Sequence, residues 1–232
     1  MQTKKLASEM PGISPPNGRN CESWAKLFSN FAEKAALEAR NGLLQFDEVQ
    51  RIVDGLPKTG FRLRPPLVRK LQQIAIQDIH TCAGNYRTGM VYIASTSHVP
   101  PAPGEVPGLV EEICGYVNDN WQASALHLAA YSMWRVNWIH PFTGGNGRTS
   151  RAVSYLVLCA RLGYRLPGVL TIPEQIVANR EPYYQALDAA AEAWAAGKLD
   201  VGRMEVLLSE MLAGQLLPAH RQARGGPSGR AQ

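Results

Sequence analysis

The segment 140–151 brings together residue types that can carry out chemistry on a phosphate group. Its order is His-Pro-Phe-Thr-Gly-Gly-Asn-Gly-Arg-Thr-Ser-Arg, and apolar runs flank it on both sides. Gly144, Gly145 and Gly147 permit backbone conformations barred to other residues, so successive N–H groups can point at one spot. The run that follows is predicted to be a helix, whose free N–H donors and positive dipole end also lie at this turn. The segment therefore predicts an anion-binding turn at the start of a helix.

Two arginines and a histidine add charge and a base to this turn. Arg148 and Arg151 lie three residues apart, hence on roughly the same face of the predicted helix, and offer planar charged donors. His140 precedes the glycines and is the only titratable group in the loop able to act as a base near pH 7. Together they predict phosphoryl or nucleotidyl transfer in which the histidine activates the incoming nucleophile. The alternative is a structural turn in which His140 only caps a helix.

Helical patterning dominates the part of the chain that must position this turn. Apolar residues recur every three or four positions in several stretches. The helices expected from this spacing cover 24–38, 67–84, 110–117, 125–138, 153–162, 176–194 and 201–217. Evidence for a strand is confined to 89–98, which contains Val91, Tyr92 and Ile93. The sequence therefore predicts an all-α domain that carries one short β-hairpin.

The chain of 232 residues is long enough for one well-cored domain, and stretches rich in Pro and Gly mark its limits. We expect a flexible leader at 1–20, a single domain at 21–217 and a disordered basic tail at 218–232. No segment resembles a membrane span or an export signal. The protein is therefore predicted to be soluble and cytoplasmic.

The net charge does not indicate a nucleic-acid partner. It is +5, and three arginines of the predicted tail account for part of it, which leaves +2 for the rest of the chain. These are Arg221, Arg224 and Arg230. Such a small excess differs from the concentrated basic face of DNA-binding domains.

The segment 140–151 resembles the signature of the Fic family, HPFx[D/E]GNGRxxR, in the Fic/Doc superfamily. Eight fixed positions of that signature agree with this sequence. The stretch 84–93 is similar to the family's flap hairpin, and 181–187 to a tyrosine-containing segment of its C-terminal helices. The resemblance extends over roughly 22–216 and implies a Fic-type helical bundle with a short β-hairpin flap.

This resemblance implies a protein adenylyltransferase that transfers AMP from ATP, or another NMP from its triphosphate, to a target protein. His140 is then the base that deprotonates a Ser, Thr or Tyr hydroxyl of the target. Arg148 holds the β-phosphate and stabilises the departing pyrophosphate, and Arg151 binds the γ-phosphate.

The resemblance also assigns roles to the loop backbone and to the flap. The α- and β-phosphates are cradled by three consecutive residues, Gly145, Asn146 and Gly147. The flap pins an extended segment of the target protein by main-chain pairing. The residues at its centre are Val91, Tyr92 and Ile93.

The sequence departs from the family signature at Gly144, where the family usually has Asp or Glu. That acid holds the Mg²⁺ that bridges the nucleotide phosphates, and glycine has no side-chain oxygen to offer a hard cation. Mg²⁺ is then held by phosphates and water, or by another acid, or the activity is weak or altered. A Fic-like phosphotransferase and a weakly catalytic nucleotide-binding regulator are therefore alternatives.

The segment 34–42 is loosely similar to an inhibitory helix found in many Fic proteins, [S/T]xxxE[G/N]. In those proteins the glutamate pairs with the second arginine of the signature. Glu38 occupies the glutamate position here, while Lys34 and Ala39 depart from the pattern. We hypothesise that Glu38 restrains Arg151; the alternative is a surface glutamate on an amphipathic helix.

Overall fold

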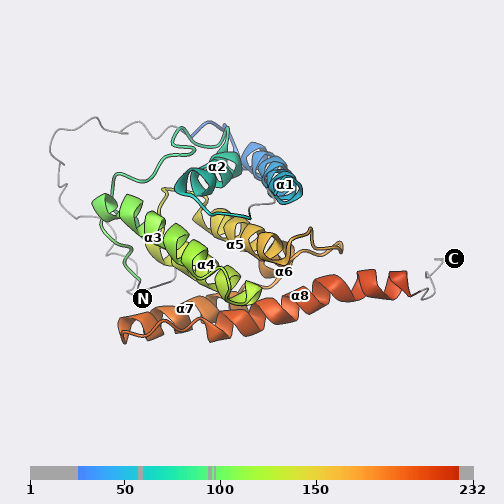
Figure 1. The fold of residues 1–232 in the computed structure, drawn as a ribbon. Coiled ribbons are helices and arrows are strands. Elements are labelled where there is room, and N and C mark those ends of the chain that lie inside the picture. The colour runs from blue at the N-terminus through green and yellow to red at the C-terminus, as the bar shows by residue number, and fades with distance from the viewer. Residues whose placement is uncertain (1–25, 57–59, 94–95, 97, 225–232) are drawn as a thin grey trace, which may run out of the picture.

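The computed structural model describes residues 26–56, 60–93, 96 and 98–224 (Figure 1). The elements within these residues are α1 (Phe31–Asp54), α2 (Pro65–Ile76), the short 3₁₀ helix η1 (Pro103–Glu105), α3 (Val106–Asp119), α4 (Ala125–Ile139), α5 (Asn146–Leu162), α6 (Ile172–Ala178), α7 (Glu181–Ala195) and α8 (Gly202–Ala223). The prediction of an all-α fold is confirmed. No helix among the described residues is long and apolar enough to cross a membrane.

The helices α4 and α5 form the centre of the molecule. Figure 1 shows them between α1 and α2 on one side and α7 and α8 on the other. Both are buried along most of their length. The sequence of α4 is mostly apolar, whereas α5 also buries polar side chains near its start, among them Asn146, Thr149 and Ser150. The chain between these two central helices is the loop that carries His140, so the packed core fixes both ends of that loop.

The ends of the central helices have identifiable local causes. The side chain of Ser124 accepts a hydrogen bond from His127 N and caps the start of α4. At its other end α4 stops at His140, whose φ of 49° is left-handed. The helix α5 begins after Gly145 (φ 77°) and ends at Gly163 (φ 86°), the stop expected from the sequence.

Several predicted helix limits differ from the observed ones. The helix α1 begins at Phe31 rather than near 24, because Asn30 caps it by accepting from Glu33 N. The helix α2 ends at Ile76, well before 84, and Asp78 just beyond it has a left-handed φ of 59°. The single helix expected at 176–194 is two, α6 and α7.

The β-hairpin expected at 89–98 is not formed by the residues of this segment that the structure describes. The one β-bridge in the described residues joins Lys26 and His80 instead. The Arg87 guanidinium donates to the carbonyls of Gly89, at 3.1 Å, and Pro101, at 2.5 Å. Side chain-to-backbone hydrogen bonds therefore hold the base of the segment in place of a strand ladder. Residues 94, 95 and 97 lie outside the described part.

The predicted outer limits of the domain are tested only in part. The helix α8 continues through Pro218 to Ala223, past the boundary at 217. The leader expected at 1–20 and most of the expected tail, 225–232, lie outside the residues that the structure describes.

We predict that Gln215 is a main stabilising contact of the α5–α6 connection. Its buried side chain accepts from Ile172 N and donates to Tyr155 Oη, at 3.1 and 2.9 Å, and it also contacts the Leu166 carbonyl. Substitution Gln215→Ala leaves these buried groups without partners and should lower the free energy of unfolding by about 2–3 kcal/mol in urea titrations.

The matched control is Gln222→Ala, an exposed position on the same helix, which should change the stability by less than about 0.5 kcal/mol. Equal unfolding midpoints for the two variants would contradict the assignment.

Candidate active site

His140 stands at the junction of α4 and the loop 141–145. Its backbone N–H donates to Val136 O at 3.0 Å, and its left-handed conformation turns the chain away from the helix axis. Two residues later the side chain of Phe142 is fully buried and contacts the Tyr86 ring, with centroids 5.5 Å apart. The apolar anchor on one side and the helix on the other fix the position of His140.

The side chain of Asn146 closes the loop on itself. Its Oδ1 accepts from Phe142 N at 3.0 Å, and its Nδ2 donates to Phe142 O at 2.7 Å. The predicted role of Asn146 at the phosphates therefore applies only to its backbone N–H, because its amide is already hydrogen-bonded within the loop. Gly145 must be glycine, since a Cβ there would lie 2.7 Å from Ile76 Cγ2 and φ is 77°.

Two buried polar residues that the sequence analysis did not assign also hold the loop. Gln72 of α2 donates to Gly144 O at 3.1 Å and accepts from Gly84 N at 2.6 Å. Arg87 donates to the His140 carbonyl at 2.8 Å, and its own N–H donates to Pro141 O at 3.0 Å.

The signals for these two residues in the sequence are weak. Gln72 stands beside Gln73 in a helix and is not distinguished from it by residue type. Arg87 lies in the stretch similar to the flap, but that likeness gives it no role. It is 2% exposed, and all of its hydrogen bonds within the described residues go to carbonyl oxygens rather than to a carboxylate.

The imidazole of His140 is neutral at physiological pH. Burial lowers its pKa to about 4, against a weaker opposite effect of the Asn137 carbonyl, and the positive charge of Arg87 lowers it further. The Nδ1 atom lies 3.4 Å from Asn137 O, an acceptor, which assigns the proton to Nδ1. The Nε2 lone pair is then free to take a proton from a substrate hydroxyl.

The start of α5 gathers N–H donors and guanidinium groups at the loop. The N–H groups of its first turn have no acceptor within the helix. Arg148 donates from Nη2 to Glu38 Oε1 at 3.3 Å, and its buried Nη1 has no partner among the described residues. Arg151 makes no hydrogen bond or ion pair within that part of the chain. Burial is the main cause that lowers the pKa of both groups, and the negative charge of Glu38 opposes this effect at Arg148.

A cavity of about 620 Å³ opens beside His140. Its walls are formed by aromatic and aliphatic side chains of α4 and α7, with the carboxylates of Glu181 and Asp188 among them. The apolar lining residues include Trp134, Trp138, Tyr184 and Leu187. A flat aromatic ring system such as a nucleobase fits walls of this kind.

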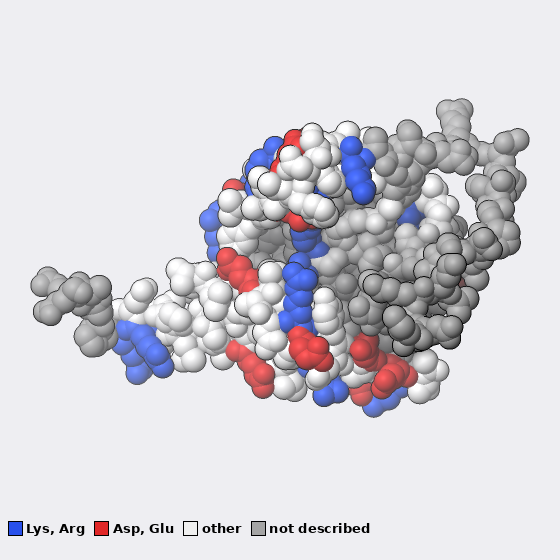
Figure 2. Space-filling model, turned by 180° about the vertical axis from the view of Figure 1, so that it is seen from behind, with Lys and Arg blue, Asp and Glu red and all other residues white. Residues whose placement is uncertain are grey.

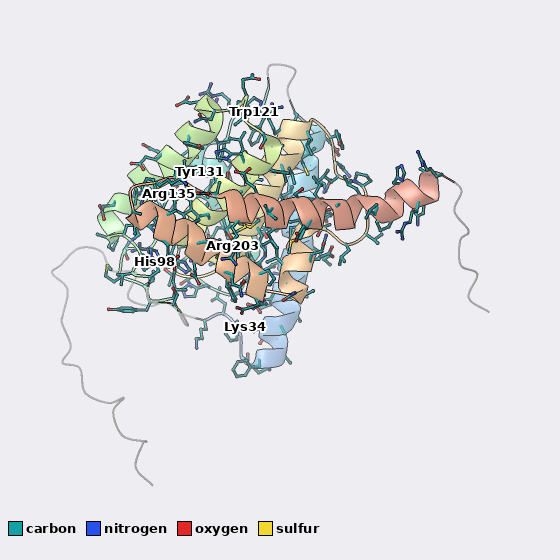
Figure 3. The ribbon with its side chains drawn as sticks, turned by 90° about the horizontal axis from the view of Figure 1, so that it is seen from below. Lys34, His98, Trp121, Tyr131, Arg135 and Arg203 are labelled. Atoms are coloured by element: carbon teal, nitrogen blue, oxygen red, sulfur yellow. The ribbon has the colours of Figure 1, made fainter. Side chains whose placement is uncertain are left out.

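The segment predicted as a flap borders this cavity at one end. Ile93 and His98 line it, and Figure 3 shows His98 beside α7. The His98 ring nitrogen Nε2 lies 2.7 Å from Trp138 O, and the two rings are in contact. Tyr92 points elsewhere and is 87% exposed. Of the three predicted flap residues, Ile93 is therefore the one at the cavity, and Val91 and Tyr92 are not among its lining residues.

Glu38 of α1 reaches the site but contacts a different arginine from the one expected. Its Oε1 lies 3.3 Å from Arg148 Nη2 and 3.8 Å from Lys34 Nζ. The pair predicted with Arg151 is not formed. The expected partner of Glu38 was therefore wrong, since the carboxylate contacts Arg148. An inhibitory role of Glu38 stays a prediction.

The residues around the loop do not fit a protein-held Mg²⁺. Gly144 has no side-chain oxygen, and no group of three His, Cys, Asp or Glu side chains among the described residues could hold a metal ion. The nearby hydroxyl oxygen of Thr143 is buried without a partner there, but a single neutral hydroxyl is a poor site for a divalent cation. No Cβ placed on Gly144 would meet another atom within 4 Å.

The Fic/DOC family matches residues 62–158 of this chain, which include the loop and both arginines. A curated relative, protein adenylyltransferase Fic of Drosophila persimilis, is 39% identical over 112 residues, which are 47% of this chain and 20% of the relative. The corresponding protein of Drosophila willistoni is 37% identical over 111 residues with the same coverage. The match thus spans about a fifth of the length of these relatives.

Solved structures share the fold. A Fic domain containing signaling protein from Bacteroides thetaiotaomicron aligns with a TM-score of 0.68 and 24% identity, over 88% of this chain and 78% of that one. Fic-1 from C. elegans aligns with a TM-score of 0.62 and 20% identity, over 81% and 52%. The Fic-type helical fold expected from the sequence is therefore confirmed.

The low pKa of His140 leads to a prediction for solution measurements. The imidazole should titrate with a midpoint near 4 rather than 6.5 in NMR spectra, with its signals assigned by their loss in His140→Ala. A general base acts in its neutral form. Any reaction that uses His140 as the base should therefore keep its rate as the pH falls to about 5, and the rate should drop below that pH. A midpoint close to 6.5 would contradict the buried position of the ring.

Proposed function

We propose that this chain, in which residues 62–158 form a Fic/DOC family region, is a protein adenylyltransferase that transfers AMP from ATP to a hydroxyl group of a target protein. The observation that carries the proposal is a neutral, buried imidazole placed between an anion-binding helix start and an aromatic-walled cavity. The relatives of known name support AMP as the transferred group.

The transfer is a substitution at the α-phosphorus of the nucleotide. The hydroxyl oxygen of a target Ser, Thr or Tyr forms a bond to that phosphorus, and the bond from the α-phosphorus to the oxygen of the β-phosphate breaks. His140 Nε2 takes the hydroxyl proton, and pyrophosphate leaves with the bonding electrons. The backbone N–H groups at Gly145, Asn146 and Gly147 stabilise the charge that develops on the phosphate oxygens.

The arginines have separate roles in this reaction. Arg148 binds the β-phosphate and stabilises the departing pyrophosphate, and Arg151 binds the γ-phosphate. The nucleobase occupies the cavity between Trp138 and Tyr184, and the target segment lies along the stretch 89–98. Pairing of a target segment with the free backbone of this stretch is consistent with its lack of a strand ladder among the described residues.

Two observations favour a second candidate, a nucleotide-binding regulator with little turnover. Gly144 gives no ligand for a divalent cation, and Glu38 occupies one face of Arg148 in the structure. A Fic-like phosphotransferase is the remaining alternative, in which the γ-phosphate is transferred instead of AMP.

We predict that ATP labelled at the α-phosphate will leave its label on protein and that ATP labelled at the γ-phosphate will not. The chain is incubated with each ATP, alone and with a cell extract, and the products are separated on a denaturing gel. His140→Ala should abolish the labelling. Retention of only the γ-label would indicate a phosphotransferase, and nucleotide binding with no retained label would indicate the regulator.

We further predict that Glu38→Gly will raise self-labelling about tenfold, because the variant frees Arg148 from a charge-assisted hydrogen bond. Glu210→Gly is the control, since Glu210 is an exposed glutamate inside a helix and the variant carries the same cost of glycine in a helix. Equal labelling by Glu38→Gly and the unmodified chain would show that the contact to Arg148 has no inhibitory effect.

A further inference from the structure

A third arginine lies at the site, outside the signature segment. Arg180 immediately precedes α7 and is exposed, with no side-chain hydrogen bond or ion pair to the described residues. The next residue, Glu181, lines the cavity beside His140. Arg180 is therefore the chain neighbour of a residue that lines this cavity, although it is not itself among the lining residues.

Hydrogen bonds hold the start of α7 against the end of α4 and near the start of α5. One turn after Arg180, the buried Tyr183 hydroxyl accepts from Asn137 Nδ2 at 2.7 Å and lies 3.5 Å from Ser150 Oγ. Ser150 is the neighbour of Arg151 in α5. The positive charge of Arg180 is near enough to contribute to the lowered pKa of Arg151. The charge of Arg148 has the same effect on the pKa of Arg151, so the three arginines, two in α5 and one at the start of α7, lie in one neighbourhood.

The charge of these three groups is compensated only in part within the described residues. Glu38 pairs with Arg148, while neither Arg151 nor Arg180 has a carboxylate partner there. Figure 2 shows basic side chains in a column on one face, in a hollow between the upper and lower parts of the molecule, with acidic side chains at both ends of the column. Neighbouring like charges repel one another. Such a cluster therefore lowers the free energy of unfolding unless a polyanion binds beside it.

The same site does not provide what a protein-held cation requires. The signature position that usually carries an acid is Gly144, and the space around it is open. The negative charge of a bound triphosphate must be balanced by positive charge. Because the chain offers no ligand for a metal ion at Gly144, the guanidinium groups of the arginines are the side chains that can supply this charge.

We propose that Arg180 is a third phosphate-binding side chain of this site, and that the three arginines bind the triphosphate without a cation held by the protein. This inference rests on the proposed function, because it assumes that a nucleoside triphosphate is the ligand. Arg180 contacts the terminal phosphates, which lie beyond the α-phosphate next to His140.

The test measures the Kd of ATP by calorimetry on the full chain, once in EDTA and once in excess Mg²⁺. The same two measurements are made on the Glu38→Gly variant, in which Arg148 is free of its carboxylate partner. The Kd should differ by less than about threefold between EDTA and Mg²⁺. Arg180→Gln should weaken ATP binding in EDTA about tenfold and leave AMP binding unchanged, since AMP lacks the terminal phosphates.

The matched control is Arg221→Gln, an exposed arginine near the far end of α8 (Figure 1), which should leave the Kd unchanged. Gly144→Asp should weaken ATP binding in EDTA about tenfold by charge repulsion, and Mg²⁺ should restore it. Circular dichroism of each variant checks that the helices remain folded.

The outcomes separate this inference from the proposed function. Loss of ATP binding in EDTA by the unmodified chain would overturn the inference, as would equal Kd values for Arg180→Gln and Arg221→Gln. Binding that follows the expected pattern supports the inference even when the labelling experiment shows no AMP transfer. Failure to bind any nucleotide, with or without Mg²⁺, would overturn both.

Discussion

The fixed backbone of the turn between α4 and α5 is the constraint on which the rest of the site depends. Left-handed residues stand at both ends of the turn, and the amide of Asn146 bonds to the N–H and carbonyl of Phe142 across it. Gln72 and Arg87 hold the same turn from outside. The imidazole and the helix start therefore have one relative position before any ligand binds, which removes an ordering cost from the reaction.

Burial has opposite consequences for the base and for the arginines. It removes the charge of His140 at neutral pH, which makes the ring a proton acceptor. The guanidinium groups of Arg148 and Arg151 stay charged because their ordinary pKa is so high, so burial raises their energy and strengthens their attraction to an anion. In the structure, the carboxylate of Glu38 is the nearest internal substitute for such an anion. If the site binds a nucleotide as proposed, Glu38 of the first helix and the nucleotide compete for the charge of Arg148.

The sequence was sufficient to predict the all-α fold class and the position of the loop between two helices. The apolar runs of α4 and α5 and the stop at Gly163 were visible, because burial and glycine conformation leave strong local signals. The hairpin was not formed among the described residues; instead the Arg87 side chain donates to the Gly89 carbonyl inside the segment and to the Pro101 carbonyl beyond it. The partner of Glu38 also depended on how α1 packs, and residue spacing carries no information about that.

Other residues near the loop have weak signals in the sequence. Gln72 is a polar residue beside another polar residue, and only the packing of α2 against α5 brings it to the loop. Arg180, the proposed third arginine, is likewise flanked by polar residues. A signature identifies side chains that share one short segment. It does not identify those that reach the same place from distant parts of the chain, and these include several of the groups that fix the geometry here.

The empty volume around Gly144 has an evolutionary consequence. Every glycine codon is one base change away from a codon for aspartate or glutamate, and a Cβ at this position meets no neighbouring atom within 4 Å. The backbone conformation there is also not of the left-handed kind that only glycine adopts easily. A lineage can therefore gain or lose a metal anchor in one mutational step without rebuilding the loop, and descendants with and without the acid are expected to share the same backbone.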